Sequence, residues 1–242
     1  MPQVLINSVN RDSSENSNSF VFPIGFPLYN IRKVKLLSVI IPNTIYNVHN
    51  STSQNLNNIQ WKSGATSYSY TIPSGNYTMT TLLSQLQSGM NGVQSNSWSW
   101  TYSSTTMLVS VSGTSAFTLQ VCPQRILGFA SSQLNITQAT SLTAQNSPNL
   151  YSPVNLFLSI KELGDANITS SFNYTFWVPL NVAPGDVQLL SVSNGLPEQV
   201  IEFKTNPLYA LQQLTIKLYD DNHNLINLNN TDWKLLLEVG SE

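Results

Sequence analysis

One stretch near the C-terminal end, "LYDDNHNLINLNNTDWKLLLEV", has residue types that metal chemistry uses. Asp220, Asn222 and Asn224 follow the spacing that begins a calcium-binding loop. A loop of the helix–loop–helix type also requires Gly at its sixth position and a bidentate Glu at its twelfth. Counting from Asp220, these positions hold Leu225 and Thr231, so the stretch does not predict a calcium site.

Catalysis by a Ser or Cys nucleophile needs a histidine base, and the chain has two histidines, His49 and His223. His223 lies beside Asp221, as in half of a catalytic pair, but neither histidine is next to a G-x-S-x-G motif. Cys122, in "VCPQR", matches no cysteine-enzyme signature, and we expect a buried, inert thiol. No pair of acids stands out, and no glycine-rich phosphate-binding motif occurs. We predict that the protein is not an enzyme and that it uses no metal or cofactor.

The aromatic run "SWSWTYS" is the best candidate for a ligand-binding surface. In a strand, Trp98, Trp100 and Tyr102 lie on one face, because side chains alternate with period two. Aromatic rings on an open sheet face stack on sugar rings. The alternative, which this pattern indicates more often, is a core or interface face.

Charged residues make up only 9% of the 242 residues, against about 25% in typical domains. The net charge of −2 provides no basic field for a phosphate backbone, so we do not expect nucleic acid as a partner. Like-charge repulsion is one means of keeping proteins apart. A surface rich in amides and hydroxyls therefore favours a protein that its neighbours cover.

The compartment is predicted from the single cysteine and from the N-terminal residues, which lack a signal-peptide pattern. Both indicate synthesis in a reducing environment. The longest apolar stretch, "VKLLSVIIP", is much shorter than the roughly 20 residues of a membrane helix. We expect no direct membrane span.

Period-two alternation recurs in short runs separated by Asn, Gly, Ser and Pro, which predicts a mainly β protein. The candidate strands are numerous enough for two packed sheets. One segment differs, because its apolar residues recur at helical spacing with Thr78 as the cap and Asn91-Gly92 as the stop. The apolar residues of this short amphipathic helix are Met79, Leu82, Leu83, Leu86 and Met90.

The acidic stretch near the C-terminus is itself flanked by alternating apolar residues, from Leu214 to Leu218 and from Trp233 to Val239. Asp and Asn bond to their own backbone and tolerate left-handed conformations, so they suit turns. We predict a terminal strand pair joined by a turn, with Trp233 in the core and His223 at a solvated or interfacial tip.

Several stretches, taken in order, resemble a known family. They are "INSVNRDSSENSNSFVFPI", "IRKVKLLSVIIPNTIYNV", "YTIPSGNYTMTTLLSQLQ", "RILGF" and "LQQLTIKLYDDNHNLINLNNTDWKLLLEV". Their succession is similar to that of the penton-type (vertex) minor capsid proteins of icosahedral double-stranded DNA viruses with a double jelly-roll major capsid protein. These viruses include virophages, polinton-like viruses and giant-virus relatives. The resemblance covers most of the chain, although residues 130–200 contribute little.

The resemblance implies a fold and a function. The fold would be a jelly-roll β-sandwich, a single jelly-roll capsid domain over residues 1–242, with an insertion within about 60–145 that carries the short helix. The function would be structural: a homopentamer that closes each five-fold vertex of the capsid. Its partners would be other copies of itself, the major capsid protein and other minor capsid proteins. It would have no catalytic residues, would be made in the reducing host cytoplasm or viral factory, and would reside in the virion.

Three alternatives remain beside this prediction. In the first alternative, the chain is another minor capsid or cement protein of the same shell. In the second, it is a receptor- or glycan-binding viral β-sandwich that uses Trp98, Trp100 and Tyr102. A glycoside hydrolase on a β-sandwich is disfavoured by the few acids. For a shell protein, we expect the N-terminal strand and the 130–150 loop to take part in contacts.

Overall fold

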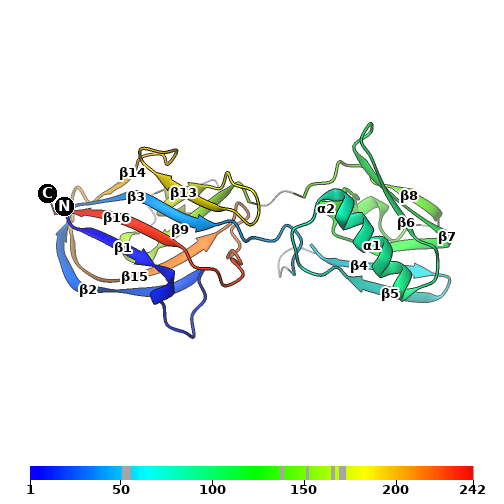
Figure 1. Ribbon diagram of the computed structural model, residues 1–242, viewed down its shortest axis with the longest axis horizontal. Helices are drawn as coiled ribbons and strands as arrows, with labels where there is room; N and C mark the ends of the chain where they lie inside the picture. The colour runs from blue at the N-terminus through cyan, green and yellow to red at the C-terminus, as the bar shows by residue number, and fades with distance from the viewer. Residues whose placement is uncertain (51–55, 137–138, 151–152, 165–166, 169–172, 242) are drawn as a thin grey trace. The chain divides into compact units, whose positions relative to one another are not determined.

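The computed structural model describes residues 1–242 except 51–55, 137–138, 151–152, 165–166, 169–172 and 242. The chain forms two compact units (Figure 1). The first, here the terminal unit, combines Met1–Ile45 with Pro153–Glu242, and the second, the inserted unit, is Tyr46–Ser152. The range of about 60–145 in which we predict an insertion falls inside the second unit.

Two antiparallel sheets form the terminal unit. The first sheet contains β1 (Gln3–Asn7), β16 (Lys234–Gly240), β3 (Lys33–Pro42), β13 (Val187–Ser191) and β14 (Gln199–Glu202), in the order β1-β16-β3, with β13 and β14 both paired to β3. The second sheet has the order β12 (Phe176–Pro179), β9 (Asn155–Ile160), β15 (Leu208–Tyr219) and β2 (Ser19–Ile31). Short elements between them are the 3-10 turns Ser8–Asn10 and Lys161–Leu163 and the small ladder of β10 (Asn167–Ile168) with β11 (Asn173–Tyr174).

The order of these strands defines a jelly roll. β13 and β14 pair with successive parts of β3, so they act as one interrupted strand. Among the described residues, numbering the sandwich strands along the chain then gives the orders 1-8-3-6 and 5-4-7-2 in the two sheets. This exchange of strands between two facing sheets is the jelly-roll arrangement. The prediction of a mainly β, jelly-roll sandwich with a short helix is confirmed.

The inner faces of the two sheets form one apolar core, because alternate residues of each strand point inward. Its members include Ile6, Phe20, Val34, Leu36, Leu158, Ile160, Leu214, Ile216, Leu235 and Leu237. Trp233 lies in this core with 2% of its surface exposed, as predicted. Its Nε1–H donates to the carbonyl of Ser17 at 2.7 Å, and its ring meets the ring of Phe20 edge to face.

The prediction for the C-terminal strands is correct in their positions but wrong in their pairing. β15 and β16 flank the acidic stretch, yet they belong to different sheets. β15 pairs with β2 and β9, whereas β16 pairs with β1 and β3. Period-two alternation shows which face of a strand is apolar, but both sheets offer an apolar face to the same core. Alternation alone therefore cannot assign a strand to one of them.

The inserted unit is a sheet with a helix against it. Its elements are β4 (Asn58–Ser63), β5 (Thr66–Thr71), α1 (Met79–Val93), β6 (Ser99–Ser103), β7 (Leu108–Val121), α2 (Gln124–Leu127), the 3-10 turn Ser131–Gln133 and β8 (Ala139–Thr143). The sheet order is β5-β4-β7-β6, and β8 also pairs with β7. Figure 1 shows α1 lying against this sheet.

Local signals explain why α1 forms where it was predicted. Thr78 is the N-cap: its hydroxyl accepts from the Thr81 N–H at 3.2 Å, and the Thr81 hydroxyl accepts from the Thr78 N–H at 2.9 Å. The buried residues of the helix are Leu82, Leu83, Leu86 and Met90. The helix ends at Val93, so the predicted stop at Asn91-Gly92 is one residue early.

Three strand predictions needed correction in this unit. The period-two runs "MLVSVS" (107–112) and "AFTLQVC" (116–122) each predict a strand, but they form one long strand, β7, and the sequence patterns do not predict β4. The stretch 130–150, predicted as a loop, contains β8, which pairs with β7. Most residues of β8 are exposed, so it lacks the apolar alternation by which a strand is identified, and only its backbone pairing defines it.

Two glycines of the inserted unit allow a test of its packing by substitution with alanine. Gly128 (φ +82°) and Gly64 (φ +58°) both have left-handed backbones. A Cβ on Gly128 would lie 2.0 Å from the backbone oxygen of Asn146, whereas a Cβ on Gly64 would meet nothing within 4 Å. We expect Gly64→Ala to lower the free energy of unfolding by about 1 kcal/mol through backbone strain, and Gly128→Ala by at least about 2 kcal/mol more.

Urea unfolding followed by tryptophan fluorescence measures both variants. Because both positions carry the same left-handed strain, the difference between the two variants isolates the clash with Asn146. Equal losses in the two variants would contradict the close packing at Gly128.

Candidate assembly surface

The residues that suggested catalysis are divided between the two units. His49 and Cys122 lie in the inserted unit, and His223 lies in the terminal unit. Cys122 is buried, and its thiol is packed among apolar side chains. Within the described part of the chain, no three His, Cys, Asp or Glu side chains are grouped so that they could hold a metal ion.

The acidic stretch acts on its own backbone. One carboxylate oxygen of Asp220 accepts from the N–H of Asn222 at 2.8 Å and from the N–H of Asn224 at 2.9 Å. The Asp221 carboxylate accepts from the N–H of Val154 at 3.0 Å. His223 has a left-handed backbone (φ +63°), as expected at a turn. These carboxylates therefore hold the connection after β15 in place.

The aromatic run forms part of the core of the inserted unit. Trp98 and Trp100 are 1% and 5% exposed, and only Tyr102, at 37%, reaches the surface. The Trp98 ring packs edge to face on Phe117 at a centroid distance of 4.8 Å. The indole Nε1–H of Trp100 donates to the sulfur of Met90 on α1 at 3.3 Å. The rings that a sugar would need are covered, and the core alternative fits this geometry.

The outer face of the first sheet carries exposed aliphatic side chains. Val187 and Leu189 of β13 point outward, because Gln188 and Leu190 between them are buried. Leu189 pairs with Ile40 of β3, and Val187 pairs with Pro42, so the apolar row continues across both strands.

The same outer face continues over β16 and β1. Leu5 of β1 pairs with Leu236 of β16, and Leu236 pairs with Ser38 of β3. Leu5, Leu189 and Val187 are 57%, 58% and 62% exposed, and Ile40 is 37% exposed. We call the set Leu5, Ile40, Val187, Leu189 and Leu236 the aliphatic face. An outer sheet face exposed to water is normally polar, so this face is unusual for a subunit alone in solution.

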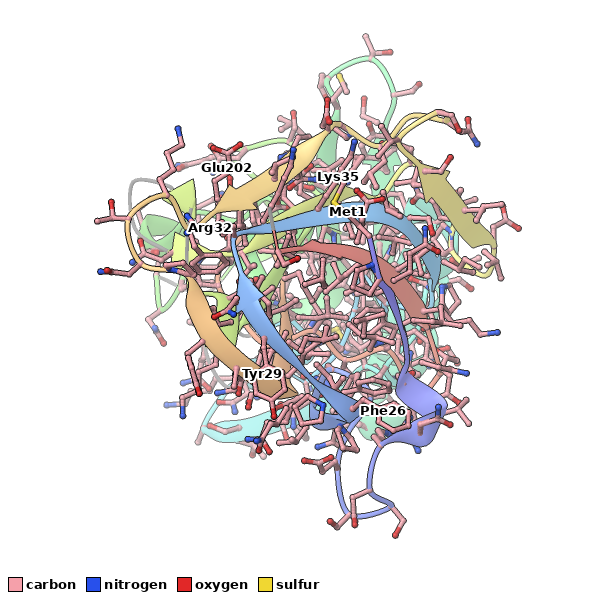
Figure 2. All side chains as sticks on the ribbon, turned by 90° about the vertical axis from the view of Figure 1, so that its left-hand side faces the viewer. Met1, Phe26, Tyr29, Arg32, Lys35 and Glu202 are labelled. Atoms are coloured by element: carbon pink, nitrogen blue, oxygen red, sulfur yellow. The ribbon has the colours of Figure 1, made fainter. Side chains whose placement is uncertain are left out.

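A second apolar surface lies on β2 and β15 of the other sheet. Phe26, Tyr29 and Tyr209 are 85%, 55% and 77% exposed. The rings of Tyr29 and Tyr209 meet edge to face at 6.2 Å. We call these three residues the aromatic edge. In Figure 2, Phe26 and Tyr29 lie along β2, away from Lys35 on β3 and Glu202 on β14.

Charged side chains of β3, β14 and β16 share the outer face of the first sheet with the aliphatic face, and several of them are paired. Lys35 donates to Glu198 at 2.7 Å, and this hydrogen bond raises the pKa of Lys35 and lowers the pKa of Glu198. Lys204 lies 3.3 Å from Glu202. On the aliphatic face, Lys234 stands opposite Ile40 in the sheet. Covering the aliphatic face would therefore also desolvate Lys234.

Sequence reasoning identified neither surface. A signal for the aliphatic face is present in β3, β13 and β16, where Ile40-Ile41, Leu189-Leu190 and Leu235–Leu237 are apolar without interruption. Strands with two apolar faces are covered on both sides, as in buried sheets. No comparable signal marks the aromatic edge, because exposed aromatic residues in "IGFPLYN" have the same pattern as buried ones.

No family model matches the chain, and no curated protein sequence matches it. Among solved structures, the chain is similar to the crystal structure of a selenomethionine-labelled mavirus penton protein. The TM-score is 0.48 and the sequence identity 11%, and the alignment covers 99% of this chain and 100% of that one. No helix in the described residues is long and apolar enough to cross a membrane.

Thiol reactivity tests the burial of Cys122. Desolvation raises the pKa of this thiol to about 12, so at pH 8 it is protonated and covered. We expect no more than slow labelling by iodoacetamide in the folded protein and complete labelling in urea, measured by intact-protein mass spectrometry. Rapid, complete labelling of the folded protein at pH 8 would contradict this burial.

Proposed function

We propose that this chain is a structural virion protein, a penton-type minor capsid protein. In this proposal, five copies form a ring that closes a five-fold vertex and contacts the major capsid protein. The observation that carries the proposal is a jelly-roll unit whose outer sheet face bears exposed Leu, Ile and Val side chains. Such a face is stable in water only at a cost, which burial against a neighbour removes.

The interior of the jelly roll argues against one of the other functions that this fold serves. Jelly rolls occur in capsid proteins, lectins and cupins. Cupin-type chemistry takes place inside the sandwich, but here the inner faces meet in a packed core of aliphatic side chains such as Leu158, Leu214 and Ile216. Within the described residues, the interior leaves no room for a ligand, so a partner would bind on the outside of the sandwich.

The sequence resemblance adds independent support, because three of its five stretches build strands of the terminal unit. The N-terminal motifs form β1, β2 and β3, and the C-terminal motif forms β15 and β16. These strands include the centre of the first sheet and therefore part of the aliphatic face. The low content of charged residues fits a subunit that is covered on several sides.

The proposal extends to the partners and the compartment. The subunit would contact other copies of itself, the major capsid protein and other minor capsid proteins, and it would reside in the virion. Synthesis in the reducing host cytoplasm or viral factory suits a chain whose single cysteine, Cys122, is a buried free thiol.

The glycan-binding alternative has lost its main support, since Trp98 and Trp100 are buried. Another minor capsid or cement position in the same shell uses the same fold and surfaces equally well. Copy number and oligomeric state separate that alternative from a vertex position.

Two measurements test the proposal. Native mass spectrometry of the purified chain should give a pentamer in equilibrium with monomer, because an icosahedral vertex has five-fold symmetry. Quantitative mass spectrometry of purified virions should give a small, fixed ratio of this chain to the major capsid protein, five copies for each vertex.

Other results have defined meanings. A ratio well above five per vertex, together with a trimer or dimer in solution, would assign the chain to another capsid position. A chain that stays monomeric at high concentration and is missing from purified virions would disprove a capsid role.

A further inference from the structure

We infer that the aliphatic face of one copy packs against the aromatic edge of the next copy, so that the contact between neighbours joins two different surfaces. The inference rests on the proposed function and names the contact that would build the ring. The occupant of both surfaces is a second copy of this chain.

The two surfaces belong to different sheets of one sandwich. The aliphatic face is the outside of the first sheet, whereas the aromatic edge lies on β2 and β15 of the second sheet. Leu28 and Leu208 pack on the core, and their chain neighbours Tyr29 and Tyr209 therefore point outward from the second sheet. A copy can thus contact one neighbour through each surface at the same time.

Symmetry makes two different surfaces informative. A two-fold dimer buries the same patch on both copies, so a single apolar patch is enough. A closed ring requires a heterologous contact, in which one patch on each copy meets a different patch on the next. A subunit with two separate exposed apolar surfaces has what a ring needs.

The size of the surfaces fits an interface centre. With about 200 Å² for each aromatic side chain, the exposed fractions of Phe26, Tyr29 and Tyr209 give on the order of 400 Å². A stable interface buries about 800 Å² on each partner, with an apolar centre inside a polar rim. The aromatic edge supplies such a centre, and the surrounding amides and hydroxyls can form the rim.

The backbone of β2 favours a contact through side chains over the addition of a strand from the neighbouring copy. This strand is the outer strand of its sheet and contains Pro23 and Pro27, and its pairing with β15 has a bulge between Leu211 and Gln213. Prolines and bulges on an edge strand oppose the addition of a further strand. The aromatic edge is therefore suited to side-chain packing, and Phe and Tyr rings packing on Leu, Ile and Val provide it.

Mixing two complementary variants of the full-length chain tests the inference. Leu189→Asp places a charge in the aliphatic face and leaves the aromatic edge intact, whereas Tyr209→Asp does the reverse. Each variant alone should associate about thirtyfold more weakly than the wild type, or not at all. An equimolar mixture should form a one-to-one heterodimer in native mass spectrometry, because one good contact remains between the two variants.

Controls keep the result interpretable. Both side chains are largely exposed, so thermal unfolding should match the wild type. Met107→Asp, at a position 54% exposed in the inserted unit, adds the same charge outside both surfaces and should assemble like the wild type.

The possible outcomes distinguish failure of the inferred contact from failure of the proposed capsid function. If the wild type assembles but either Asp variant still forms the full oligomer, or the mixture forms no heterodimer, the inference is wrong while the capsid proposal stands. If Met107→Asp dissociates the oligomer as strongly, the contact lies elsewhere and the inference is equally overturned. A wild type that is monomeric at every concentration contradicts the proposed ring itself, and with it the inference.

Discussion

The first sheet of the terminal unit carries apolar side chains on both faces, and the rest of the structure depends on how each face is covered. The second sheet covers the inner face within the same chain, which gives the jelly-roll core around Trp233. Leu5, Ile40, Val187 and Leu189 remain on the outer face, where no described part of the chain buries them. Burial of apolar surface is the main favourable term in both folding and association. The same strands therefore provide a core on one side and a candidate contact surface on the other.

The two ends of the chain hold this sheet together. β1 and β16 are neighbours in it, and the Trp233 N–H donates to the hydroxyl of Ser8, which in turn donates to Asp232 at 3.0 Å. Arg11 forms an ion pair with the same carboxylate. Residues more than 220 positions apart thus share one hydrogen-bonded cluster at the edge of the core. This cluster keeps β1 in register with β16, and this register places Leu5 beside Leu236 on the aliphatic face.

Local and non-local features differ in how far the sequence predicts them. The helix α1 was predicted because Thr78 and the spacing of Leu82, Leu86 and Met90 act within a few residues of one another. The assignment of β15 and β16 to different sheets depends on contacts across the whole chain, and alternation contains no information about them. The same limit applies to the candidate site: alternation placed Trp98 and Trp100 on one face, but whether α1 or a ligand covers that face is decided by packing. The aliphatic face was visible as uninterrupted apolar residues, yet which of them point outward follows only from the pairing.

The central claim is that the aliphatic face is a contact surface between subunits of a shell. A reconstruction of purified virus particles at side-chain resolution tests it most directly. The account predicts this chain at the five-fold vertices, with Leu189 and Ile40 of each copy buried against the next copy. Density for this chain in which the outer face of the first sheet is open to solvent would contradict the account.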